Sequence, residues 1–193
     1  MTVFEYIMGI HSIVLGLATA SLLSTFAEQL KYREATGHYW VHSAWCVTLL
    51  FFILSGWWGY WYTFDKLENI SIFTFLYTFQ YSIAMYLCAR LLSPDPVREP
   101  EGTSIEEYYF RVKTPFLIVF LYGILTWSLA SPLGVLPSLP QGELTEAVVG
   151  WIVFNTLLLA AIFSSNRLLH GVVVTLILLM QIAGEAAQGA IGL

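Results

Sequence analysis

Long apolar stretches recur six times along the chain, and short polar segments separate them. A membrane-spanning helix needs about 20 mostly apolar residues to cross roughly 30 Å of hydrocarbon, and each stretch meets or approaches that length. We place the predicted spans at 4–29, 39–62, 70–92, 113–133, 147–164 and 168–190. The pattern therefore predicts an all-α fold, a polytopic bundle of six transmembrane helices that forms one membrane domain over residues 1–193.

The composition agrees with a membrane protein and excludes several other classes. Charged residues make up 11% of the chain and hydrophobic residues 58%, whereas a soluble domain carries about 25% charged residues. So little charge cannot cover a soluble surface, and the net charge of −5 offers no basic face for nucleic acid. The sequence contains no nucleophile elbow, phosphate-binding loop, H-E-x-x-H motif or dinucleotide fingerprint, so an enzyme is a minority interpretation.

The basic residues predict how the spans are oriented. Seven of the eight follow the first, third or fifth span, and Lys66 alone falls on the other side. These seven are Lys31, Arg33, Arg90, Arg98, Arg111, Lys113 and Arg167. By the positive-inside rule, the segments that carry them are cytoplasmic, including the linker 93–112, and both termini are periplasmic. Glu5 stands where a signal peptide carries positive charge, so we interpret the first stretch as a retained helix.

The end of the linker 93–112 carries a helix-start signal. Ser104 and Glu107 match the S-x-x-E capping box. One interpretation is a short helix at headgroup level that ends before Pro115 enters the fourth span. The other is a helix that begins there and continues into the span.

Uncharged polar side chains inside the spans are the first set of candidate functional residues. Counted from the predicted orientation, they occupy the outer-to-middle layer of the membrane, with two acids at the outer rim. The layer residues are His11, Gln80, Asn155 and Gln181, and the rim residues are Glu5 and Glu185. They predict a polar substrate or ion pathway that opens to the periplasm. The alternative is that these groups hydrogen-bond across the bundle and hold helices together.

A second candidate set lies near the predicted cytoplasmic side. His38 and His42 are one helical turn apart, and His170 begins the last span at a similar depth to His42. Two histidines from different helices are a typical haem or metal ligand pair. Two points argue against a haem or metal site. Haem sites usually lie deeper in the membrane, and a histidine such as His38 is stable at the membrane–water interface without a metal. Cys46 and Cys88 lie in apolar runs and belong to no C-x-x-C pair, which favours a role as small hydrophobic residues.

Aromatic and small residues add two further patterns. Aromatic residues concentrate in the spans 39–62 and 70–92, which fits an interfacial belt or a pocket for lipid, pigment or quinone. Small residues step by three or four along one face of the first span, and such a stripe lets two backbones pack closely. The stripe comprises Gly9, Ser12, Gly16, Ala20, Ser24 and Ala27. Its partner is either another helix of the chain or a second copy.

The stretch FEYIMGIHSIVLGLATASLL, with YWVHSAWCVTLLFFILSGWWGYW and the later EEYYF, resembles an uncharacterised family of small bacterial polytopic membrane proteins. The resemblance implies a location in the bacterial inner membrane and carries no activity, ligand or site residue.

Three functions remain open at this point. The leading hypothesis is a small homo-oligomeric channel or transporter with a polar cavity facing the periplasm. The second is a non-catalytic subunit of a larger membrane complex that organises lipid, pigment or quinone. The third is a haem- or metal-binding membrane protein. Membrane lipid, further copies of the chain and other subunits are the partners that we expect, and nucleic acid is not among them.

Overall fold

The computed structural model describes residues 3–31, 37–64, 70–95, 102–130, 132–133 and 144–191. Every long element in these residues is an α-helix, and they contain no strand. The helices are α1 (Val3–Lys31), α3 (Trp40–Phe64), α4 (Ile72–Leu92), α5 (Ile105–Leu129), α6 (Leu144–Phe163) and α7 (Arg167–Ile191). The expected all-helical fold is thus confirmed, with one helix for each predicted span.

Five of the helices are long and apolar enough to cross a membrane, and they are α1, α3, α4, α5 and α7. In α6 the apolar stretch within the described residues is shorter, at Val148–Phe163. The chain is therefore compatible with a multi-pass integral membrane protein. The sixth crossing at α6 and the periplasmic placement of both termini stay predictions.

The fourth helix begins earlier than the predicted span. Ser104 caps α5 with the full capping box, because its hydroxyl accepts from the Glu107 amide while the Glu107 carboxylate accepts from the Ser104 amide. The helix then continues through Pro115 to Leu129 without a break. Of the two interpretations of this segment, the continuous helix is the one observed.

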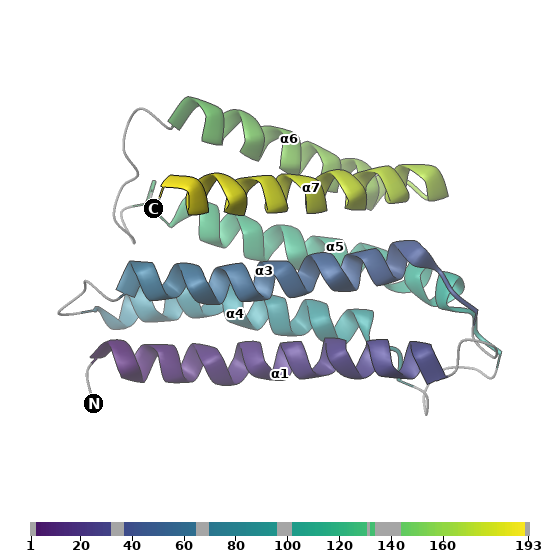
Figure 1. Ribbon diagram of the computed structural model, residues 1–193, viewed down its shortest axis with the longest axis horizontal. Coiled ribbons are helices and arrows are strands. Elements are labelled where there is room, and N and C mark those ends of the chain that lie inside the picture. The colour runs from purple at the N-terminus through teal and green to yellow at the C-terminus, as the bar shows by residue number, and fades with distance from the viewer. Residues whose placement is uncertain are drawn as a thin grey trace.

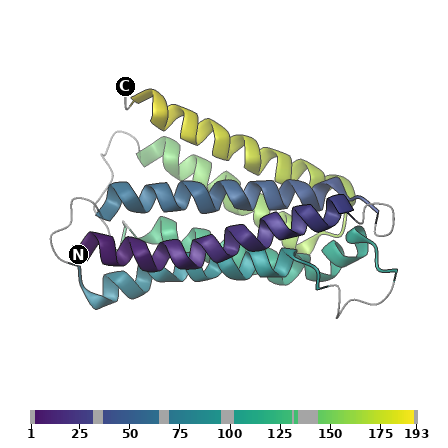
Figure 2. The ribbon, with the colours of Figure 1, turned by 60° about the horizontal axis from the view of Figure 1, so that its bottom comes forward.

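The helices run alternately up and down, and their axes lie roughly side by side (Figure 1). Helix α4 packs between α1 and α5, α3 packs on α1, α4 and α7, and α6 packs between α5 and α7. The start of α1 and the end of α7 lie at the same end of the bundle (Figures 1 and 2). We call the other end the basic end. There α1, α4 and α6 finish and α3, α5 and α7 begin, and Lys31, Arg90, Arg111, Lys113 and Arg167 lie on these segments.

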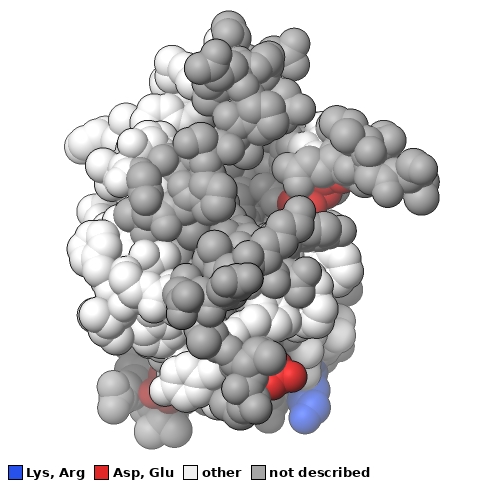
Figure 3. All heavy atoms as spheres, turned by 90° about the vertical axis from the view of Figure 1, so that its left-hand side faces the viewer, with Lys and Arg blue, Asp and Glu red and all other residues white. Residues whose placement is uncertain are grey.

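Figure 3 views the end opposite to the basic end, where the described surface is mostly neither acidic nor basic. The described charges thus follow the same asymmetry as the sequence. The positive-inside rule predicts that the basic end faces the cytoplasm. That assignment stays an expectation.

Aromatic rings fill much of the core between α3, α4 and α5. Trp45 meets Phe116 edge-on at a centroid distance of 5.2 Å, and Phe52 meets Phe120 in the same way at 5.1 Å. Edge-to-face pairs are the favoured arrangement of aromatic rings, and they add specificity where lipid competes for apolar contact. The aromatic residues of α3 therefore serve the packed core as well as the surface.

Close backbone approach occurs at glycines other than those of the α1 stripe. A Cβ atom on Gly56 would lie 2.5 Å from the Tyr81 ring, and one on Gly123 would lie 2.8 Å from Met85. A Cβ atom on Gly9 or Gly16 would meet nothing within 4 Å, and Gly16 is exposed. Most of the α1 stripe is thus exposed, although Ser12 accepts a hydrogen bond from the Trp57 indole on α3 at 2.8 Å. Its contact with a second copy stays a prediction.

Candidate functional site

The buried polar side chains of the half opposite to the basic end are held in local pairs. His11 on α1 bonds through Nδ1 to the Ser82 hydroxyl on α4, at 2.7 Å. Its other ring nitrogen, Nε2, is buried and has no hydrogen-bond partner among the described residues. Aromatic rings surround this imidazole, with the Tyr60 centroid 4.2 Å away and the Phe79 centroid 5.5 Å away.

The other residues of the expected polar pathway have separate partners. Tyr122 donates to the Gln80 side chain across α5 and α4, and Gln181 donates to Glu185 one turn along α7, at 3.0 Å. Asn155 donates to the carbonyl of Trp151 on its own helix, at 2.7 Å. Glu5 is exposed near the start of α1.

These residues do not converge on one set of contacts. Helix α1 packs on α3 and α4, whereas α6 packs on α5 and α7, so His11 and Asn155 lie in different layers of the bundle. The Gln80–Tyr122 pair is exposed on the bundle surface. A polar pathway through these six residues remains a prediction. The contacts of His11 and Gln80 link helices, as in the alternative, whereas those of Asn155 and Gln181 stay within their own helices.

At the basic end, His42 and His170 are both fully hydrogen-bonded. His42 accepts from Gln29 at Nδ1 and donates from Nε2 to the carbonyl of Leu92, both at 2.8 Å. His170 bonds the Tyr109 hydroxyl through Nδ1 at 2.7 Å and the Ser164 carbonyl through Nε2 at 3.0 Å. A metal or haem iron could bind either ring only after one of these bonds breaks. His38 is exposed, and the described residues hold no group of three His, Cys, Asp or Glu side chains suited to a metal.

A chain of hydrogen bonds joins four helices at this end. The indole of Trp45 donates to the Tyr109 hydroxyl at 3.0 Å, and that hydroxyl in turn contacts His170. Lys113 donates to the carbonyls of Ile162 and Ser164, at 3.2 and 2.7 Å, where α6 ends. A cation at a helix C-terminus satisfies unpaired carbonyls and complements the helix dipole. The corner between α6 and α7 is thereby held against α5 and α3.

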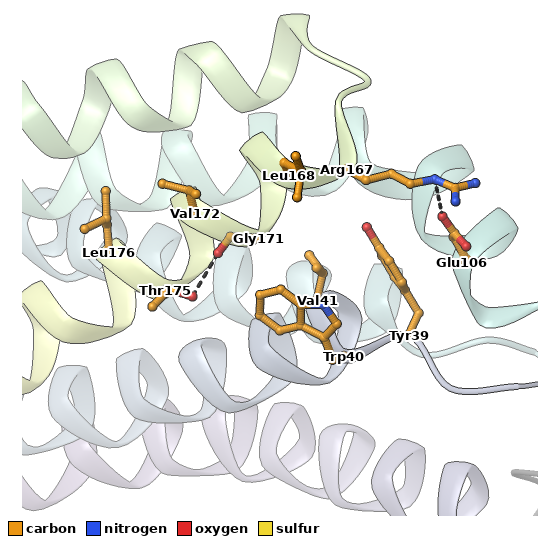
Figure 4. Close-up of a pocket in the computed structure, with 10 residues that line it drawn as sticks. All are labelled: Tyr39, Trp40, Val41, Glu106, Arg167, Leu168, Gly171, Val172, Thr175 and Leu176. Carbon is orange, nitrogen blue, oxygen red and sulfur yellow. Dashed lines mark hydrogen bonds and ion pairs between the residues drawn. The ribbon is translucent and has the colours of Figure 1, made fainter.

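Beside this corner lies a cavity of about 500 Å³ between α3 and α7. Most of its wall is apolar and comes from Trp40, Val41, Leu168, Gly171, Val172 and Leu176. Figure 4 shows α3 and α7 contributing from opposite sides. Gly171 is required there, because a Cβ atom on it would lie 2.7 Å from the Trp40 ring. Leu168 and Val172 are 80% and 57% exposed, so the cavity opens on the outer surface of the bundle.

The charged side chains of the cavity lie together at one end of it, which we call its mouth (Figure 4). Nε of Arg167 lies 2.6 Å from Oε1 of Glu106, and the ring of Tyr39 extends from the start of α3 toward this ion pair (Figure 4). Oε1 of Glu106 is buried, and beyond this ion pair it has no hydrogen bond among the described residues. The Tyr39 hydroxyl is likewise buried with no hydrogen-bond partner in the described chain. Burial raises the pKa of Tyr39, and Glu106 raises it further while Arg167 opposes the change.

This cavity combines residues that the sequence analysis used for other purposes. Arg167 served there only to orient the spans, and the start of the second span was not treated as a site. The sequence carried one signal for this grouping, the similar depth of the three residues in the bundle. Each of them, Tyr39, Glu106 and Arg167, precedes or begins a helix at the basic end. What brings them together is the packing of α3 against α7, two helices far apart in the sequence.

Comparison with known proteins assigns no family to the chain. No protein-family model, no curated protein and no solved structure matches it. The resemblance to small bacterial membrane proteins and the bacterial inner membrane stay expectations. The function is therefore inferred from the residues of the chain itself.

Proposed function

We propose that this protein is a non-catalytic integral membrane protein that binds a membrane amphiphile in the cavity between α3 and α7. It would act as a lipid-organising subunit, alone or within a larger membrane complex. The observation that carries the proposal is a cavity with an apolar wall and a charged mouth, open to the surface of an apolar bundle. An amphiphile is the ligand class with the same division between an apolar part and a polar part.

The polar mouth has to supply most of the selectivity. A lipid chain gains little by moving from bilayer to protein, because both surroundings are apolar. Charge-assisted hydrogen bonds at the mouth are not matched by the bilayer interior, and they would retain a ligand that chain packing alone would not. The positive-inside rule places this mouth at the cytoplasmic leaflet, so the ligand would enter sideways from that leaflet.

Filling the cavity tests the proposal. Thr175 lines the cavity and its hydroxyl only bonds the Gly171 carbonyl of its own helix, at 2.9 Å. We expect Thr175→Phe to lower the lipid that co-purifies with the protein in mild detergent by about tenfold, as measured by mass spectrometry. Leu179→Phe is the matched control, because Leu179 is exposed on α7 and does not line the cavity. Equal lipid content in both variants and in the parent protein would contradict the proposal.

A homo-oligomeric channel is the second candidate, and two surface features favour it. The pairs Gln80–Tyr122 and Gln181–Glu185 lie at or near the surface of the bundle, where lipid chains offer them no hydrogen-bond partner. The small-residue stripe of α1 is also exposed and offers a face for a second copy. Several copies would then place the polar pathway between them, with Glu5 and Glu185 toward its periplasmic opening.

Flux into vesicles distinguishes the channel from the lipid-binding subunit. A channel requires ion flux from the reconstituted protein, and a loss of that flux in Glu185→Gln and His11→Phe. A reconstituted protein that purifies as a monomer and conducts nothing rejects the channel. The haem or metal alternative requires a visible absorption band or bound metal in the same preparation.

A further inference from the structure

We propose that the cavity mouth selects a zwitterionic phospholipid whose headgroup ends in a primary ammonium, the chemistry of phosphatidylethanolamine. This inference rests on the proposed function, because it names the ligand of the same cavity. Three observations at the mouth lead to it: a buried hydroxyl without a partner beside an ion-paired carboxylate, an exposed guanidinium, and a charge balance of zero among the described lining residues.

The buried Tyr39 hydroxyl lacks a hydrogen-bond partner, and the buried Glu106 carboxylate beside it can accept further hydrogen bonds. The Tyr39 hydroxyl has no hydrogen-bond partner among the described residues, and Tyr39 is only 9% exposed. At the same mouth, Oε1 of Glu106 is buried and is paired with Nε of Arg167 at 2.6 Å, with no further hydrogen bond in the described chain. A buried polar atom without a partner is costly, and a native structure usually satisfies it through a ligand or water. A primary ammonium carries three N–H donors and could serve both oxygens. A quaternary choline ammonium has no N–H group and could serve neither.

The guanidinium of Arg167 fits the phosphate of the same headgroup. Its side chain is 74% exposed, and Figure 4 shows its terminal nitrogens pointing away from Glu106. A guanidinium binds a phosphate through two parallel hydrogen bonds, which a lysine ammonium does not. The phosphate and the ammonium of an ethanolamine headgroup are a few bonds apart, so one headgroup could contact both members of the ion pair.

The charge balance disfavours the other common headgroups. Arg167 and Glu106 sum to zero, and no other charged side chain lines the cavity among the residues that the structure describes. A net-anionic headgroup would gain from Arg167 and be repelled by Glu106 at the same time. A zwitterion places each of its charges beside the opposite one, and its chain continues along Val41, Val172 and Leu176.

The experiment uses the full chain in vesicles made of equal amounts of phosphatidylethanolamine and phosphatidylcholine. After mild solubilisation, the ratio of the two bound lipids is compared with the ratio in the vesicles. We expect about fivefold enrichment of the ethanolamine lipid on the parent protein, the size of a modest net charge interaction. Glu106→Gln should bring the ratio close to that of the vesicles without lowering total bound lipid, and Tyr39→Phe should lower it about twofold.

Glu28→Gln and Arg90→Gln are the controls, because both residues are exposed at the basic end and neither lines the cavity. They should leave the enrichment unchanged. Bound lipid without enrichment, or enrichment that survives both Glu106→Gln and Tyr39→Phe, overturns this inference and leaves the proposed function standing. No bound lipid above the level of Thr175→Phe overturns both.

Discussion

At the basic end of the bundle, His42 and His170 have both ring nitrogens hydrogen-bonded, whereas in the opposite half His11 has only one. All three imidazoles are fully buried. The partners of His42 and His170 come from other helices and from the α6–α7 turn, while the surroundings of His11 are mostly aromatic rings. Both regions thus bury a polar ring in an apolar bundle. Hydrogen bonds satisfy the ring at the basic end, and aromatic rings surround it in the opposite half.

This difference indicates in which part of the bundle the relative positions of the helices are fixed most strongly. Hydrogen bonds that join helices are directional, so a network such as Trp45–Tyr109–His170 fixes both register and rotation of the helices that it joins. Aromatic packing around His11 is less directional and tolerates replacement by another ring. The cavity lies against the more strongly specified region, which is where a binding site keeps its geometry.

The largest effect should follow from removing a fully bonded ring. We expect His42→Phe to lower the free energy of unfolding by about 3 kcal/mol, because the Gln29 amide and the Leu92 carbonyl both lose a buried partner. Thermal unfolding of the purified protein in detergent measures this. Wild-type stability in this variant would show that the bonds of His42 do not hold α1, α3 and α4 together.

A somewhat smaller loss should follow from releasing the α6–α7 corner. Lys113→Met keeps most of the side-chain volume but removes the Lys113 donor from the Ile162 carbonyl and leaves the Ser164 carbonyl with His170 alone, so we expect a loss of about 2 kcal/mol. Lys31→Met removes an exposed lysine at the same end and is the control. The loss should come from Lys113 alone. Similar stabilities for the two variants would mean that charge, not the two contacts, matters at this end.

Gly56→Ala tests the close approach of α3 and α4. The new methyl group would meet the buried Tyr81 ring, whose hydroxyl donates to Phe52, so the ring has no free space to move into. We expect a destabilisation of about 1–3 kcal/mol, the usual cost of overpacking. Gly16→Ala on the exposed stripe of α1 should be neutral or slightly stabilising, because alanine favours a helix. If Gly16→Ala destabilises the purified protein as much, the stripe is packed against a second copy.

The smallest effect should be that of His11→Phe. The substitution removes a buried nitrogen that has no partner and keeps a ring among rings, but it also removes the one bond to the Ser82 hydroxyl, so we expect a loss of about 1 kcal/mol. The same unfolding measurement applies, with His42→Phe as the comparison. Equal losses in the two variants would remove the distinction between the two regions. A loss of flux without a loss of stability would favour the channel instead.

Much of the fold was accessible from the pattern of apolar residues. The six stretches correspond to six helices, and the Ser104–Glu107 signal correctly marks the start of α5. The continuation of α5 through Pro115 was left open, because a proline is compatible with both a boundary and an interior position of a membrane helix.

The candidate residues were harder to interpret, because polarity and depth do not reveal which way a side chain faces. Gln80 and Gln181 were assigned to one polar layer, yet Gln80 pairs with Tyr122 of α5 and Gln181 pairs with Glu185 of its own helix. His42 and His170 were interpreted as a haem or metal ligand pair, which stays a prediction, and their observed partners Gln29, Leu92 and Tyr109 come from other helices. No local signal in the sequence predicts such partners.

The sequence by itself determined that the protein is helical, apolar and asymmetric in charge, because helix period, chain length across hydrocarbon and charge placement are local properties. Only the tertiary structure decided that Tyr39, Glu106 and Arg167 share one cavity mouth, since this depends on how α3, α5 and α7 pack. It also decided that the α1 stripe faces outward while Gly56 and Gly123 carry the close contacts. In a membrane every helix is apolar on most sides, so side-chain packing and hydrogen bonds, rather than hydrophobicity, select the faces that meet.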